Sequence, residues 1–288
     1  MEKLPKDVLI LIALELDLSD IVKLCKSNKR INEAVCENSN FWINKLKQDF
    51  NYDFSKNKNN KKKFKAKQEY HDLYEKEIQR QINMVKNKEQ DIQKIKNPIE
   101  RVQLAATKYD WYALKFIENP TEKVQLQAVR NNGEAIQFIK NPSEKVQLEA
   151  VRNSKNSPVL KLIENPNEKV QKEAIKNETW SIKYVKNPTE EMKRLAVSNQ
   201  DGSAIKFIEN PSEELQLLSV GRSGKNIEYI KNPSDKVKWA AINNEGWAIG
   251  YIENPTEEMQ LAAVTQNLYV LKYIGNPSEA VKRATQKK

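Results

Sequence analysis

Residues 119–140 read NPTEKVQLQAVRNNGEAIQFIK, and closely related stretches follow one another along most of the chain. The dipeptide Asn-Pro occurs nine times, with its asparagine at 97, 119, 141, 165, 187, 210, 232, 254 and 276. The spacings are therefore 22, 22, 24, 22, 23, 22, 22 and 22 residues. A fixed period of this length is the signature of a repeat architecture, so the repeat decides the fold.

Each unit predicts two short helices. We expect the asparagine to act as N-cap, the proline to take the first helical position, and a glutamate such as Glu122 to take the third. Apolar side chains within 124–129 predict a first helix of about 11 residues with a buried face. Those within 136–139 predict a second helix of six or seven residues, short enough to be partly 3₁₀.

A 22-residue unit of two helices cannot bury its apolar side chains alone, so neighbouring units must stack. The sequence therefore predicts an all-α protein whose residues 96–288 form an α-solenoid of about 8.5 two-helix repeats, each 22–24 residues long. The tenth position of each unit predicts a close approach between layers. It is occupied by Ala106, Ala128, Ala150, Ala174, Ala196, Ala241 and Ala263, and by Ser219 in one unit.

The residue before each Asn-Pro alternates in charge along the array. The eight residues in chain order are Lys96, Glu118, Lys140, Glu164, Lys186, Glu209, Lys231 and Glu253. If equivalent positions lie one layer apart, each charge has an opposite charge above and below it. We therefore expect a ladder of exposed ion pairs that fixes the register of the stack, each worth a few tenths of a kcal/mol.

Residues 1–50 lie outside the repeat and predict three or four short helices. The characteristic stretches are LPKDVL at 4–9, LDLSDI at 16–21, LCKSNKRIN at 24–32 and NSNFW at 38–42. A domain this small has a marginal core. We therefore expect it to complete that core against a partner.

The order of these stretches resembles an F-box, most closely the F-boxes of large DNA viruses, over 46 of the 288 residues. Ile31 stands where many cellular F-boxes have a tryptophan. From Asn97 onward the units resemble leucine-rich variant repeats and the short repeats of large DNA viruses. The resemblance implies a three- or four-helix F-box-like domain at 1–50. The composition of residues 51–95, rich in Asn and Lys and then in Gln, Glu and Lys, predicts a basic loop and helical connector.

By this resemblance, the F-box would dock a Skp-type linker subunit and, through it, a cullin. The residues expected to insert into the subunit are Leu4, Pro5, Val8, Leu9 and Ile12, with Leu16, Ile21, Leu24 and Trp42 in support. The alternative is that these side chains only cap the solenoid, which makes the chain a non-catalytic repeat scaffold. For Leu16, Leu24 and Trp42, packing in the core is as plausible as contact.

Composition points away from an enzyme. Cys25, Cys36 and His71 are the only cysteines and histidine, too few for a four-ligand zinc site, and we expect the cysteines to be buried and reduced. No glycine-rich phosphate loop or nucleophile turn is present. We expect no cofactor and no metal. No apolar run approaches the roughly 18 residues that span a bilayer, so we expect no membrane partner. Residues 1–7 place charge and proline where a signal peptide needs an apolar core, so we expect an intracellular protein, cytoplasmic or nuclear (in a host cell if viral).

The basic charge is concentrated rather than spread over the repeats. The chain carries a net charge of +10, but residues 97–288 hold 28 basic and 24 acidic side chains. Lys56–Lys67 reads KNKNNKKKFKAK, with seven lysines and no acid. This tract predicts a solvated loop; the alternative is a nucleic-acid-binding solenoid that uses it.

Exposed aromatic residues anchor many protein interfaces. Trp111, Tyr112, Trp180, Trp247 and Tyr269 fall in the polar stretch between the two helices of a unit and are the candidate substrate contacts. The alternative is that each covers its neighbouring layer. Together these features predict a monomeric, substrate-recruiting F-box adaptor of a cullin-RING (SCF-type) ubiquitin ligase, whose repeats bind a protein substrate.

Overall fold

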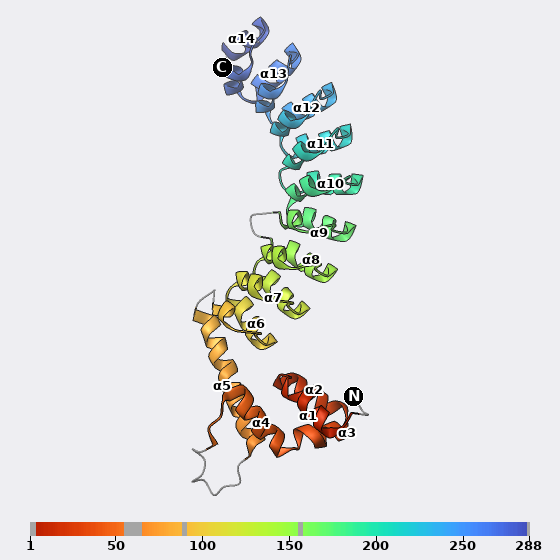
Figure 1. Ribbon diagram of the computed structural model, residues 1–288. Coiled ribbons are helices and arrows are strands. Elements are labelled where there is room, and N and C mark those ends of the chain that lie inside the picture. The colour runs from red at the N-terminus through yellow and green to blue at the C-terminus, as the bar shows by residue number, and fades with distance from the viewer. Residues whose placement is uncertain (1–3, 55–64, 88–90, 155–157, 287–288) are drawn as a thin grey trace. The chain divides into compact units, whose positions relative to one another are not determined.

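The computed structural model describes residues 4–54, 65–87, 91–154 and 158–286. These residues form helices and turns with no strand among them, which confirms the all-α fold class (Figure 1). The chain divides into two compact units, Met1–Val102 and Gln103–Lys288, so the helical connector belongs to the first. No helix in the described ranges is long and apolar enough to cross a membrane. Most of the Lys56–Lys67 tract lies outside the described residues.

The N-terminal unit packs five α-helices around one core. Its elements are α1 (Lys6–Leu14), α2 (Leu18–Ser27), α3 (Lys29–Ile31), the π-helical turn η1 (Asn32–Cys36), α4 (Ser39–Phe50), α5 (Ala66–Asn87) and the 3₁₀ helix η3 (Asp91–Lys94). Asp17, Asn28 and Asn38 cap α2, α3 and α4 by accepting hydrogen bonds from backbone N–H groups. Ala66 and Tyr70 of α5 are buried in the same core as α1–α4, so the connector completes the module.

The repeats alternate strictly between α-helices and 3₁₀ helices. The α-helices are α6 (Glu100–Tyr109), α7 (Glu122–Asn131), α8 (Glu144–Arg152), α9 (Glu168–Asn177), α10 (Glu190–Ser198), α11 (Glu213–Arg222), α12 (Asp235–Asn244), α13 (Glu257–Gln266) and α14 (Glu279–Gln286). The 3₁₀ helices are η4 (Trp111–Phe116), η5 (Gly133–Phe138), η6 (Val159–Leu162), η7 (Thr179–Tyr184), η8 (Ser203–Phe207), η9 (Gly224–Tyr229), η10 (Gly246–Tyr251) and η11 (Leu268–Tyr273).

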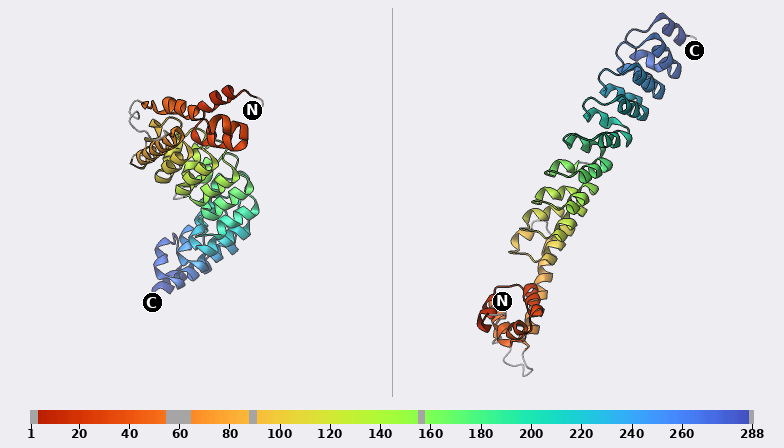
Figure 2. Two further views of the ribbon diagram at one scale, coloured as in Figure 1. Left: turned by 90° about the horizontal axis from the view of Figure 1, so that it is seen from below. Right: turned by 90° about the vertical axis from the view of Figure 1, so that its right-hand side faces the viewer.

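Successive units of the array stack in single file. From α7 to α14 each α-helix contacts the next, and each 3₁₀ helix from η4 to η11 contacts the next. The α-helices therefore form one side of the array and the 3₁₀ helices the other (Figures 1 and 2). The buried side chains of a layer, such as Val124, Val129 and Ile136, lie between these two rows. The alanines at the tenth position of each unit are buried too, and their small size allows the layers to approach closely.

The start of each unit differs from the expectation. Asn119 and seven equivalent asparagines adopt a left-handed conformation, with φ between 46° and 54°, and do not cap the helix. The N-cap is the residue after proline: Thr121 Oγ1, for example, accepts a hydrogen bond from Val124 N. The asparagine is needed because it tolerates a left-handed turn better than other non-glycine residues. Glu122 consequently takes the first helical position rather than the third.

The ladder of ion pairs lies elsewhere than expected. Among the described residues, none of the eight alternating charges before Asn-Pro lies within 4.0 Å of an opposite charge. The ion pairs between layers join the α-helices instead, as between Arg152 and Glu173 at 2.6 Å and between Lys169 and Glu144 at 2.7 Å. The alternating row lies beyond the 3₁₀ helices, where its side chains extend into solvent.

The serine at the tenth position of one unit has a structural reason. The preceding unit has one additional residue in its turn, where Gly202 is left-handed with φ 73°. The longer turn presents two carbonyls to the next layer. Ser219 Oγ donates to Gly202 O at 3.0 Å, and Asn226 Nδ2 donates to Asp201 O at 2.7 Å. Ser219 therefore satisfies a buried carbonyl that an alanine would leave without this donor.

Candidate functional site

The first candidate site is an exposed apolar face on α1, formed by Val8, Leu11 and Ile12. Their exposed fractions are 36%, 64% and 37%, whereas Leu9 and Ala13 on the same helix are buried. Residues three and four apart share one side of a helix, so the three exposed side chains form a continuous patch. We call this patch the α1 face.

The residues expected to dock a partner divide into two groups. Leu9, Ile21, Leu24 and Trp42 are buried in the core of the module. In this structure they can support a docking surface but cannot insert into a partner, and for Leu9 this differs from the expectation. Pro5, Val8 and Ile12 are exposed, and Leu4 and Leu16 are half-buried against the core.

Leu11 is the most exposed residue of the α1 face, and sequence reasoning missed it. The helix reads KDVLILIAL, in which every residue from Val8 onward is apolar. With no polar residue to mark the solvent side, the period alone does not show which apolar side chains are buried. The packing of α1 against α4 and η1 decides it.

A polar network anchors the C-terminal end of α1. Lys45, buried in α4, donates through Nζ to Leu14 O at 2.5 Å and pairs with Asp49 at 3.0 Å. Tyr70 of α5 donates its hydroxyl to Asp49 Oδ2 at 2.6 Å. Burial, together with this hydrogen bond, raises the pKa of Tyr70 well above its ordinary value, so the phenol remains a donor. The network joins the helix that carries the α1 face to α4 and α5.

The two cysteines are buried as expected, but they are not reduced. Cys25 of α2 and Cys36 of η1 form a disulfide. Trp42 packs nearby, donating its indole N–H to Cys36 O at 3.0 Å, with its ring centroid 5.7 Å from that of His71. Burial lowers the pKa of His71. The described residues contain no group of three or more His, Cys, Asp or Glu that could hold a metal ion.

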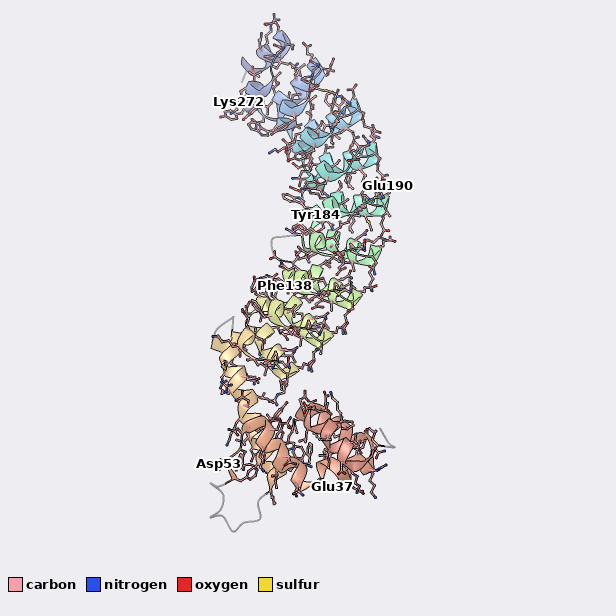
Figure 3. The ribbon with its side chains drawn as sticks, viewed as in Figure 1. Glu37, Asp53, Phe138, Tyr184, Glu190 and Lys272 are labelled. Carbon is pink, nitrogen blue, oxygen red and sulfur yellow. A yellow bond between two sulfur atoms is a disulfide. The ribbon has the colours of Figure 1, made fainter. Side chains whose placement is uncertain are left out.

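The second candidate site is the outer side of the 3₁₀ helices. The last residue of each 3₁₀ helix forms an exposed or half-buried row, which we call the aromatic row. In chain order its members are Phe116, Phe138, Leu162, Tyr184, Phe207, Tyr229, Tyr251 and Tyr273. Figure 3 shows Phe138 and Tyr184 on one side of the array and Glu190, which begins α10, on the other.

The predicted substrate contacts lie beside the aromatic row. They belong to the 3₁₀ helices themselves and not to a loop between helices. Tyr112, Trp180, Trp247 and Tyr269 are exposed, Tyr269 by 75%, whereas Trp111 is half-buried. Four of these five residues also contact the aromatic row of the next unit, with ring centroids 5.2–6.1 Å apart. These pairs are Trp111 with Phe138, Tyr112 with Phe138, Trp180 with Phe207 and Trp247 with Tyr273.

The aromatic row itself was not expected. Phe138 lies between Ile136 and Ile139, and all three are apolar residues of the expected second helix. In a 3₁₀ helix three residues make one turn, so Ile136 and Ile139, three apart, share the buried side, and Phe138 faces outward. The signal in the sequence is an aromatic residue before the last buried isoleucine of nearly every unit.

Lysines lie against these rings. The residue before the aromatic row is lysine in five of the eight 3₁₀ helices, at 115, 161, 183, 206 and 272. Lys206 Nζ is 4.1 Å from the ring centroid of Trp180 and 5.5 Å from that of Tyr229, so it spans neighbouring layers. Lys115, Lys183 and Lys272 also lie over aromatic rings. Cation–π contacts of this kind hold an ammonium group in place while leaving its charge exposed.

Comparison of the chain with protein-family models, with curated proteins and with solved structures finds no match.

Proposed function

We propose that the chain is a substrate-recruiting F-box adaptor of a cullin-RING ubiquitin ligase. In this proposal the α1 face docks a Skp-type linker subunit, and the repeats hold a protein substrate near the ligase. Ubiquitin transfer is carried out by other subunits, so the chain acts by proximity and needs no catalytic residue of its own.

The α1 face is the observation that carries the proposal. Three large aliphatic side chains are exposed together on one helix of a module whose other apolar side chains are largely buried. Leaving such a patch in water costs free energy that a partner would recover, at about 25 cal/mol for each Å² buried. The patch follows Leu4 and Pro5, the first residues of the stretch that resembles an F-box, which is where that resemblance places the linker subunit.

The module also offers a rigid support for docking. The Lys45–Asp49–Tyr70 network fixes the end of α1, and the Cys25–Cys36 disulfide joins α2 to η1. A helix held in this way loses little conformational entropy on binding, which favours affinity.

The test is direct binding of the purified full-length chain to a Skp-type subunit by calorimetry. The variant Val8→Asp/Ile12→Asp places charge on the α1 face without touching a buried residue. Lys26→Asp, on an exposed position of α2, is the control for added negative charge. We expect the face variant to lose binding and the control to keep it, with unchanged melting for both. Failure of the folded wild type to bind any Skp-type subunit would overturn the proposal.

A further inference from the structure

Basic residues have close acidic partners on one side of the repeat array but not on the other. On the α-helix side, basic residues pair with acids of the adjoining layer, as Arg130 does with Glu149 and Lys172 with Glu191. On the side of the 3₁₀ helices, none of the described lysines at the position before the aromatic row lies within 4.0 Å of a carboxylate. These lysines therefore lack the close carboxylate partners that neutralise the basic residues of the α-helix side.

The balance of charge on this side is positive. We define the 3₁₀ face as the last and the last but one positions of η4–η11, with the fifth-from-last position of those that have six residues. It carries six lysines, with Lys225 added to the five before the aromatic row, and two glutamates, Glu134 and Glu228. Hydrogen bonds from Ser203 lower the pKa of Asp201, and the nearby charge of Lys206 adds to this lowering. An occupant with carboxylates therefore complements this face.

The lysines and the rings alternate at the spacing of the layers. Packed helices lie about 8–10 Å apart. A polyproline II segment advances about 3.1 Å per residue with three residues per turn, so every third side chain recurs about 9.3 Å further on the same side. An acidic residue at every third position thus meets the lysines of the three successive layers η6–η8, which are Lys161, Lys183 and Lys206. The proline rings between them meet the aromatic row, as prolines do in other aromatic-lined grooves.

A peptide fits this surface better than a nucleic acid. The rings of Trp180, Phe207 and Tyr229 already have Lys206 over them. The unpaired glutamates of the alternating row, such as Glu164 and Glu209, follow the same 3₁₀ helices and repel phosphate. A polypeptide can carry both signs of charge, whereas a nucleic-acid strand is negative throughout.

We propose that the 3₁₀ face binds an extended, acidic, proline-containing segment of a protein, centred on Trp180, Lys183 and Lys206. This inference deepens the proposed function. It rests on that proposal only in calling the bound segment a substrate. The binding itself depends only on the array, so the two proposals can fail separately.

The test uses the full-length chain and fluorescence anisotropy at physiological salt. The probe is a labelled peptide of four Glu-Pro-Ser triplets, compared with one of four Lys-Pro-Ser triplets and with a single-stranded RNA of twelve nucleotides. Lys183→Gln/Lys206→Gln removes two charges from the 3₁₀ face. Lys169→Gln/Lys193→Gln removes two from the α-helix side, where both lysines are paired.

We expect the acidic peptide alone to bind measurably. The face variant should weaken it by about tenfold or more, and the α-side control should leave it within about twofold. No binding of the acidic peptide, an equal loss in both variants, or tighter binding of the RNA would overturn the inference. The same variants are assayed with the Skp-type subunit. If the wild type binds the acidic peptide but not the Skp-type subunit, the adaptor proposal alone is overturned.

Discussion

Gly133, at the start of η5, is a site where one methyl group should disturb the stacking of the array. A Cβ added there would lie 2.1 Å from Ala150 O, a backbone atom of the next layer that cannot move alone. Gly133 N also donates a hydrogen bond to Asn153 O at 3.1 Å, so the two layers are joined at this point. The φ of Gly133 is not left-handed, so the cost of Gly133→Ala is steric rather than torsional.

The destabilisation expected for Gly133→Ala follows from how far the distance between the added Cβ and Ala150 O falls below an ordinary contact distance. An ordinary Cβ contact begins at 3.4 Å, so the layers would have to separate by about 1.3 Å at this point or tilt to the same extent. Overpacking of this kind typically costs about 1–3 kcal/mol. Gly221, in the exposed part of α11, provides the control because a Cβ there meets nothing within 4 Å. Gly221→Ala should stabilise the array by about 0.5–1 kcal/mol, since alanine favours a helix over glycine.

Urea unfolding followed by far-UV circular dichroism compares the two variants with the wild type. Because a repeat array unfolds through nearest-neighbour interfaces, amide hydrogen exchange is needed to locate the change. We expect faster exchange in η5 and α8 of Gly133→Ala and no such change in Gly221→Ala. A Gly133→Ala variant as stable as the wild type, or more stable, would refute the close approach of these layers.

Three further predictions concern single side chains. Asn226→Ala should cost about 1–3 kcal/mol, measured by urea unfolding, because the carbonyls of Asp201 and Ser219 each lose a hydrogen bond. Burial lowers the pKa of His71 below 6.5, so the contribution of this residue to stability is full above that pH and declines as the pH falls. His71→Gln should therefore flatten the dependence of the unfolding free energy on pH between about pH 7.5 and 5. An unchanged dependence on pH would contradict this. Glu164→Lys should change the melting temperature negligibly. Glu173→Lys, which breaks the pair with Arg152, should lower stability by up to about 1 kcal/mol at low salt. A larger loss of stability in Glu164→Lys than in Glu173→Lys would instead indicate that the residues before Asn-Pro form ion pairs between layers.

The sequence by itself determined the helical class, the number of units and the layer contacts made by small residues. These follow from local rules: a period of 22 to 24 residues, an Asn-Pro pair at the start of every unit, and alanine at every close approach but one. Even the brevity of the second helix was readable, because apolar residues spaced by two and three leave room for little more than one turn of 3₁₀ helix.

The tertiary structure decided which side chains face water. In α1 every residue after Asp7 is apolar, and only packing against the rest of the module leaves Leu11 outside while Leu9 is buried. The pairing of Cys25 with Cys36 likewise depends on the fold that brings α2 to η1. Spacing in the sequence fixes neither result, because each depends on the position of a second element.

The same reason explains the 3₁₀ face. The alternating charges before Asn-Pro are regular in the sequence, yet they form no ion pairs, whereas less regular charges on the α-helices do, as between Lys172 and Glu191. Regularity shows that positions are equivalent, but the distance between equivalent side chains depends on how the layers stack. That stacking brings lysines onto the rings of neighbouring units, as Lys206 lies over Trp180 and Tyr229. The resulting surface is the one that we propose binds a peptide.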